Sequence, residues 1–473
     1  MNGSVVRGSA AVPVALAAFF VVVQFYTSLA PLSPTPPVGF VFASRAGAAA
    51  LVAVLIVAAG YLGLAEVRGA PLPRDSRLML GAWIGAAALA ALLGFDPLSG
   101  FEVVGVMLVA ALFHLALRRA YPRPAAARAL VLAYLACGAA AVLAALAMLA
   151  LRRPAPLYAL NHGRAAGFFV TANQFAAFLD AFAFVALGTA LAARSPRLRA
   201  FAGASALLAF VALALTFSRS GWAGALAAGL FLAASLRARG VLAGLTVLAA
   251  LALAAVALRP VARHDPADAF NRLATLEAGV RAAQLFPLTG AGPMAYWRVY
   301  PSVRLPDGAP PGTFGALHPH DAYVSWAGET GAVGVAALVL GWWVFARSMR
   351  RVLAGAAASA RRFGLGVSAG LVAVLVQGLF DTIGVVQLTF VWIPYTALAF
   401  AGAASGLPWE SDAGRCEAQA GRRETEAGRG ETEAGRRENE AGLREPGRES
   451  EIGPNSGSQR EAGVRPERPA DAA

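Results

Sequence analysis

The chain has 473 residues, of which 58% are hydrophobic and only 14% are charged. A soluble domain carries about 25% charged residues, so this composition excludes an ordinary soluble globular protein. The net charge of +13 comes from 40 arginines and no lysine, and these lie mainly in short connections between apolar runs, which argues against a nucleic-acid-binding protein.

Apolar runs fill the chain up to residue 406, and most approach the roughly 20 residues that a helix needs to cross a bilayer. We therefore predict an all-α integral membrane protein with about 12 transmembrane helices. The expected spans are 11–30, 46–66, 78–95, 101–117, 129–151, 166–193, 200–217, 221–236, 241–258, 321–346, 363–384 and 386–406. Residues 1–406 then form one polytopic membrane domain, with one long loop at 258–320.

The arginines alternate between rich and poor connections, and this alternation predicts the orientation of the spans. Eighteen arginines lie before the first span and in every second connection after it, whereas the other short connections hold five. Arginine-rich connections stay in the cytoplasm. We therefore expect both termini to be cytoplasmic and the loop 258–320 to face outward.

Residues 407–473 differ from the rest because they are polar and repetitive. A seven-residue repeat rich in arginine and glutamate begins at Gly421, Gly428 and Gly435. A heptad period is typical of coiled coils, but no position of this repeat carries large apolar residues. We expect a disordered cytoplasmic tail.

The outward loop is the only long polar interruption between the spans. The stretch Asn271–Phe286 predicts a short amphipathic helix, with Leu273, Leu276, Val280 and Leu285 near helical spacing. Arg272 and the other loop arginines have two interpretations. They contact anionic lipid headgroups, or they clamp a phosphorylated substrate, since guanidinium groups bind phosphate oxygens in a bidentate fork.

Further polar residues lie at the outer ends of other spans. Arg164 precedes the sixth span, and Asn173 lies deeper in that span, where an interhelical hydrogen bond is the simpler interpretation. Arg219 lies in the tight outer turn between the seventh and eighth spans. Taken alone, Arg219 would be an arginine that extends to the membrane interface.

The tenth span begins with two histidines and two acids, His318, His320, Asp321 and Glu329. Asp321 is a candidate N-cap of the helix. Glu329 lies about two turns inside, where a carboxylate needs a partner or a water-filled cavity. Together with the outward arginines these residues favour a polar or phosphate-binding site. The pattern His318-x-His320 lacks the further spacing of a metal site, so no metal is expected.

Five of these stretches, in this order, resemble the O-antigen ligase and O-antigen polymerase superfamily of bacterial inner membranes. The resemblance covers about residues 130–385. It rests on Arg164 to Phe175, Thr216 to Gly221, Asn271-Arg-Leu with 286–293, His320 to Gly334 with its Glu-x-Gly, and Gln377 to Asp381. One departure is Asp321, where the family usually has Asn or Ser, and this alters the charge around His320.

The resemblance implies a glycosyltransferase that inverts the anomeric centre without a metal or other cofactor. Its donor would be a glycan on undecaprenyl diphosphate, and its acceptor a sugar hydroxyl on lipid A–core or on a growing glycan. The reaction would take place at the periplasmic face of the inner membrane.

The resemblance also implies roles for the residues in that reaction. Arg164, Arg219 and Arg272 would hold the diphosphate and stabilise its charge as it leaves. His320 would act as general base or orient the acceptor hydroxyl, although the sequence does not separate it from His318. Four residues would support this site, namely His318, Asn173, Asp321 and Glu329.

Several alternatives remain open at this point. A ligase adds a finished glycan and a polymerase extends a repeat-unit chain, and both share these stretches. A protein-glycosylating relative, a cell-wall polymerase of the shape-and-division type and a non-catalytic scaffold are further possibilities. A bicarbonate or solute transporter is the main alternative of another class, but the halves show no internal repeat and no paired broken spans.

Overall fold

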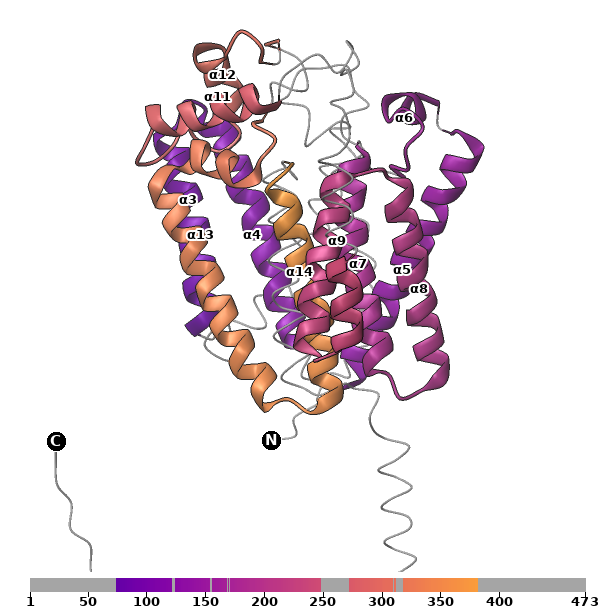
Figure 1. The fold of residues 1–473 in the computed structure, drawn as a ribbon. Coiled ribbons are helices and arrows are strands. Elements are labelled where there is room, and N and C mark those ends of the chain that lie inside the picture. Colours follow the sequence, from indigo (N-terminus) through magenta and orange to yellow (C-terminus); the bar gives the residue numbers. More distant parts are fainter. Residues whose placement is uncertain are drawn as a thin grey trace, which may run out of the picture. The chain divides into compact units, whose positions relative to one another are not determined.

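The structure is a computed structural model that describes residues 74–120, 124–153, 155–167, 169, 171–247, 272–308, 310–311 and 318–381. Within these residues it consists of helices and their connections (Figure 1). The expected spans 11–30, 46–66 and 386–406 and the repeat tail lie outside the described residues.

The helices keep the expected order along the chain. They are α3 (Arg74–Leu93), α4 (Pro97–Ala120), α5 (Pro124–Leu151), α6 (Ala155–Leu160), α7 (Ala172–Ala192), α8 (Pro196–Leu215), α9 (Arg219–Ser235), α11 (Arg272–Leu285), α12 (Tyr296–Val303), α13 (Ala322–Gly355) and α14 (Ala358–Gly378). Among the described residues, six helices are long and apolar enough to cross a membrane, in α3, α5, α7, α8, α13 and α14. The all-α membrane class is confirmed, while the count of 12 spans stays a prediction.

Most of the expected spans differ in their bounds from the helices observed. The span expected at 363–384 lies at Ala358–Gly378 as α14, so Asp381 lies beyond its end. The span expected at 166–193 begins at Ala172, because the preceding residues form turns and Thr171 caps the helix by accepting a hydrogen bond from the Gln174 N–H. The span expected at 321–346 continues to Gly355 as α13. The span expected at 241–258 is helical up to residue 247, and its remainder lies outside the described residues.

The core of the membrane part is α7, which packs against α8 on one side and α14 on another. Apolar residues surround α7 on nearly every side instead of forming a single stripe, and the helix is buried on nearly every face. The rings of Phe175, Phe178 and Phe182 stack along it, with centroids 6.2 and 5.8 Å apart. These side chains hold α7 in place, and its outer end carries Asn173.

Glycines allow α14 to approach α7 and α9 closely. A Cβ on Gly188 of α7 would lie 2.8 Å from the Gly366 Cα of α14, and a Cβ on Gly366 would collide with Gly188. Gly224 of α9 likewise leaves room for the buried Asp180 carboxyl, whose Oδ2 would lie 3.0 Å from a Cβ at this position. Small residues at helix interfaces are the usual means of close packing in membranes.

We expect Gly366→Ala to destabilise the protein by about 1–3 kcal/mol, because an overpacked helix contact forces the backbones apart. The matched control is Gly203→Ala in α8, where a new Cβ meets nothing within 4 Å. Thermal unfolding of both variants in the same detergent, followed by tryptophan fluorescence, measures the difference. Equal melting temperatures for the two variants would contradict the close α7–α14 contact.

The described part of the loop that was predicted to face outward, here called the outward loop, contains a short helix near the expected position and a second helix that the sequence analysis missed. The helix α11 agrees with the stretch predicted at 271–286, but its packing face does not agree with the leucine spacing. Its buried residues are Ala274, Thr275, Ala278, Gly279 and Ala282, whereas Leu273, Val280 and Leu285 are exposed. The reason is close approach to α13, since a Cβ on Gly279 would meet Pro319 and Val324 at 2.6 and 2.7 Å.

Candidate functional site

A cavity of about 570 Å³ lies where the outer turns of the helices meet the loop. Its walls come from the turn before α7, from α7, from the α8–α9 turn, from α11, from the segment before α13 and from the end of α14. The lining residues are Arg164, Asn173, Phe217, Arg219, Ser220, Ala223, Arg272, Leu273, Leu276, Pro319, His320, Asp321, Leu379 and Phe380. Six of the eight residues nominated from the sequence therefore share one cavity.

Arg164 connects two walls of this cavity. Its Nε donates to the Thr216 carbonyl at 2.7 Å, and its Nη2 donates to Asn173 Oδ1 at 2.9 Å. The Ala165 N–H also donates to the Leu215 carbonyl at 3.0 Å. These two bonds fix the position of the Arg164 guanidinium at the cavity wall.

Asn173 and Asp381 form the next part of the same network. Asn173 Nδ2 donates to Asp381 Oδ2, and Gln377 Nε2 donates to the Asn173 carbonyl at 2.7 Å. The other carboxyl oxygen, Asp381 Oδ1, lies 3.6 Å from His320 Nδ1. At this distance the contact with His320 is an ion-pair contact rather than a hydrogen bond. A continuous polar chain thus runs from Arg164 through Asn173 and Asp381 to His320.

The charge state of Asp381 follows from these neighbours. Burial by itself would raise the pKa of Asp381, but its interactions with His320, His318 and Arg272 outweigh burial and lower the pKa. Asp381 is therefore a carboxylate at neutral pH. A carboxylate beside Nδ1 favours the histidine tautomer in which Nδ1 carries the proton and Nε2 is the acceptor.

His318 lies beside His320 but differs from it in position and chemistry. The two rings meet edge to face with centroids 4.6 Å apart, and His318 is absent from the cavity lining. Burial, together with electrostatic interactions with His320 and Arg272, lowers the pKa of His318 to about 3. His318 therefore stays neutral in the physiological range, and His320 is the better placed of the two for chemistry in the cavity.

The backbone at the start of α13 aims His320 at the cavity. His320 has a φ of 58°, a left-handed conformation that few residues other than glycine adopt. Directly after it, Asp321 caps α13, as the sequence predicted, by accepting hydrogen bonds from the N–H groups of Tyr323 and Val324, both at 2.8 Å. The cap fixes the first turn of the helix, so the strained residue before it has a defined direction.

Glu329, like His318, is a nominated residue that does not line the cavity. It is 3% exposed, and its carboxyl accepts hydrogen bonds from the backbone N–H groups of Met294 and Tyr296 in the outward loop. The partner that a buried carboxylate requires is therefore the loop backbone.

Asp381 and Gln377 belong to the site, and the sequence analysis did not nominate either of them. Both lie in the last of the five stretches that carry the family resemblance. The sequence signal that could have identified Asp381 is an acidic residue next to an apolar run, because such a residue is a functional candidate by default in a membrane protein. The pairing itself could not be read from the sequence, since Asn173 and Asp381 are 208 positions apart.

We expect Asp381→Asn to lower the rate of any reaction in which His320 takes part about 10- to 100-fold, as is typical when a residue that orients a functional histidine is changed. The amide keeps the shape but loses the negative charge beside His320. The change should also make the free energy of unfolding fall less steeply as the pH is lowered. Because the folded-state pKa of Asp381 is lowered, the ionised carboxylate stabilises the fold above the unfolded-state pKa. This stabilisation is lost as the pH falls through the folded-state pKa.

Glu277→Gln is the control for Asp381→Asn, because Glu277 forms an exposed ion pair with Arg281 on α11 outside the cavity lining. Exposed pairs contribute at most about 1 kcal/mol. Initial rates at neutral pH and thermal unfolding between pH 3 and 7 measure both effects. Wild-type rates in Asp381→Asn would show that the carboxylate does not assist His320.

Comparison with known proteins finds one family model that matches part of the chain. Residues 204–339 match the model of the O-antigen ligase family. The matched segment contains Arg219, Arg272, His320 and Glu329, while Arg164, Asn173 and Asp381 lie outside it. No curated protein matches the chain. This match covers less than a third of the chain, and together with the membrane helices it supports the resemblance to the O-antigen ligase and polymerase superfamily.

Proposed function

We propose that this protein transfers a glycan from undecaprenyl diphosphate to a sugar hydroxyl, in the manner of an O-antigen ligase, at the periplasmic face of the bacterial inner membrane. The observation that carries the proposal is the meeting of Arg164, Arg219, Arg272 and the His320–Asp381 pair in one cavity. Cationic groups next to a histidine that is held by a carboxylate suit the departure of a diphosphate and the activation of a hydroxyl.

The diphosphate of the donor binds among the three arginines. Arg219 is the first residue of α9 and Arg272 the first residue of α11, and both are exposed side chains that line the cavity. Each guanidinium offers a planar set of donors that matches phosphate oxygens. The N-terminal ends of α9 and α11 add a weaker attraction for an anion.

The chemical step is a single displacement. The acceptor hydroxyl gives its proton to His320 Nε2 while its oxygen forms a bond to the anomeric carbon. The bond between that carbon and the diphosphate oxygen breaks, and the electron pair leaves with the diphosphate. Asp381 stabilises the imidazolium, and the arginines stabilise the charge on the leaving group. The configuration at the anomeric carbon is inverted.

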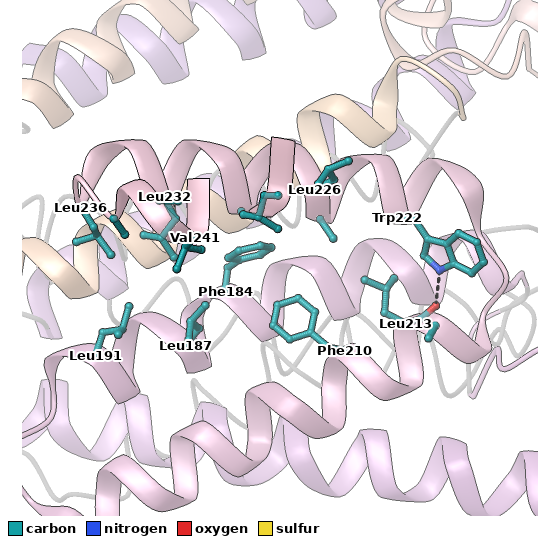
Figure 2. Close-up of a pocket in the computed structure, with 16 residues that line it drawn as sticks. Phe184, Leu187, Leu191, Phe210, Leu213, Trp222, Leu226, Leu232, Leu236 and Val241 are labelled. Carbon is teal, nitrogen blue, oxygen red and sulfur yellow. Dashed lines mark hydrogen bonds between the residues drawn. The ribbon is translucent and has the colours of Figure 1, made fainter. Parts of the chain in front are cut away.

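An apolar groove next to the cavity suits the polyprenyl chain of this donor (Figure 2). The groove has a volume of about 660 Å³ and is lined by residues of α7, α8, α9 and the helical residues 239–247. Trp222 lies at its end, held by a hydrogen bond from Nε1 to the Leu213 carbonyl at 3.1 Å. Phe217 of the cavity lies beside Trp222, with ring centroids 6.4 Å apart, so the polar cavity and the groove adjoin along α9.

Surface glycan profiling of a deletion strain tests the proposal. The strain is complemented with wild type or with His320→Asn, and membrane insertion of each protein is verified. Wild type should restore long-chain glycan, and the variant should not. Loss of all attached glycan in the deletion strain indicates a ligase, whereas single attached repeat units indicate a polymerase. Unchanged surface glycan in the deletion strain would overturn the transferase proposal.

A further inference from the structure

The outer part of α13 is interrupted, and the outward loop fills the interruption. Gly331 has a φ of 62° inside the helix, so the regular hydrogen bonds across it are lost. Four backbone hydrogen bonds to the loop replace them. They are Ala332 N to Pro287 O (2.8 Å), Val333 N to Leu288 O (3.1 Å), Ala291 N to Gly328 O (2.9 Å) and Gly292 N to Glu329 O (3.0 Å).

In these four bonds the loop takes the place of the hydrogen-bond partners that the helix would otherwise supply to itself. In an uninterrupted helix the N–H groups of Ala332 and Val333 would donate to the carbonyls of Gly328 and Glu329. Here both donors and both acceptors instead bind the loop segment 287–292. Backbone groups at this depth must find partners, so the helix and the loop satisfy each other. We call this arrangement, formed by residues 287–292 and 328–333, the loop splice.

Glycines make room for the loop splice on both sides. A Cβ on Gly290, which has a φ of 71°, would collide with the backbone of Glu329. A Cβ on Gly331 would collide with the carbonyl of Leu288 and lie 2.6 Å from the Gly290 nitrogen. The Glu-x-Gly and Gly-Ala-Gly stretches, which lie about 40 positions apart, are therefore the two halves of one contact.

The Glu329 side chain extends this contact to α12. Its carboxyl accepts the N–H groups of Met294 and Tyr296, which are the groups that begin α12. Its Oε2 has no hydrogen-bond partner in the described part of the chain. Tyr296 in turn donates its hydroxyl to the Thr275 carbonyl of α11 at 3.3 Å. Glu329 thus connects α13 through the start of α12 to the first turn of α11, where Arg272 lies.

We propose that Glu329 is a positioning residue that sets Arg272 against His320, and this rests on the proposed function. The helix α11 is held at its C-terminal end by the loop splice, at its first turn by Tyr296, and at Gly279 by Pro319 and Val324. Pro319 directly precedes His320. Losing the Glu329 carboxyl frees α12 and shifts Arg272 without touching the donor. The guanidinium then no longer meets the diphosphate in its bidentate geometry, so the donor binds more weakly.

The test is a double-mutant cycle on purified protein with an undecaprenyl-diphosphate-linked glycan as donor. We expect Glu329→Ala to raise the donor KM 10- to 100-fold and to change kcat less. We expect Glu329→Gln to retain near wild-type KM, because an amide oxygen still accepts both N–H groups. In an Arg272→Gln background, Glu329→Ala should change KM less than threefold, since the residue it positions is already gone.

Ser325→Ala is the matched control, because Ser325 is a polar residue one turn earlier in α13 that is 1% exposed. Two results would overturn the proposal. In the first, the KM increases of Glu329→Ala and Arg272→Gln multiply fully in the double variant. In the second, Glu329→Gln raises the donor KM as much as Glu329→Ala does. If Glu329→Ala does not insert into the membrane, Glu329→Asp replaces it in the cycle, since its carboxyl is one methylene too short for the α12 N–H groups.

Hydrogen exchange separates this proposal from the proposed function. Amides of residues 287–300 should exchange faster in Glu329→Ala than in Glu329→Gln or Ser325→Ala, without any substrate present. If exchange follows this pattern but wild type transfers no glycan, the contact stands and the proposed function fails. If exchange is the same in all variants, Glu329 does not hold α12 and the inference fails whatever the activity.

Discussion

His320→Asn is expected to reduce the rate of glycan transfer about 100- to 10,000-fold, the range over which general bases contribute. His320 lines the cavity and lies 3.6 Å from the Asp381 carboxylate, so it combines access to a ligand with a group that stabilises its protonated form. Asparagine tolerates the left-handed backbone at this position, which limits the effect on folding. The donor KM should change little, because the arginines hold the diphosphate.

His162→Asn is the matched control for this prediction. His162 also has a left-handed backbone, with a φ of 49°, and it lies near Arg164 but is exposed and outside the cavity lining. Steady-state kinetics with purified protein measure kcat and KM for both variants. If His320→Asn keeps more than a tenth of the wild-type kcat, His320 is not the general base, and the chemistry must lie elsewhere.

Arg272→Gln is expected to lower kcat/KM about 100- to 1000-fold, because a donor that meets developing negative charge contributes this much when water is excluded. Arg219→Gln should have a similar effect, since both arginines line the cavity from the first residues of their helices. Lysine should not rescue either position, because an ammonium group cannot form the bidentate contact of a guanidinium.

Arg281→Gln on the same helix is the control for Arg272→Gln. Arg281 forms an exposed i,i+4 ion pair with Glu277 and does not line the cavity. Binding of undecaprenyl diphosphate alone, measured by titration in nanodiscs, should weaken in Arg272→Gln and not in Arg281→Gln. Equal binding by the two variants would place the diphosphate away from α11.

Local features could be predicted from the sequence because each depends on neighbours a few residues away. Asp321 caps the helix that follows it, and Arg219 begins α9 directly after a turn of three residues. The helix α11 follows from its own periodicity. The apolar runs must form helices to satisfy their backbone groups in lipid, so the membrane class follows from composition and length alone.

The packing face of α11 and the role of Glu329 could not be predicted in this way. The leucine spacing did not identify the buried face, because Leu273 and Leu276 line the cavity instead of packing against α13. The contacts that bury α11 use alanine and glycine instead. A carboxyl group inside a predicted span is a functional candidate by default. The partners of Glu329, however, are loop N–H groups more than 30 residues before it in the chain, and local sequence does not reveal them.

The sequence by itself therefore determined the all-α membrane class, the placement of the polar residues at turns and helix starts, and the family resemblance. The tertiary structure decided which of them meet. It brought Asp381 to Asn173 and His320, moved Glu329 out of the cavity into the loop splice, and placed His318 behind His320. The physical reason is that helix formation depends on local chain chemistry, while these contacts depend on how α7, α13 and α14 pack, and close packing is set by small residues that carry little pattern of their own.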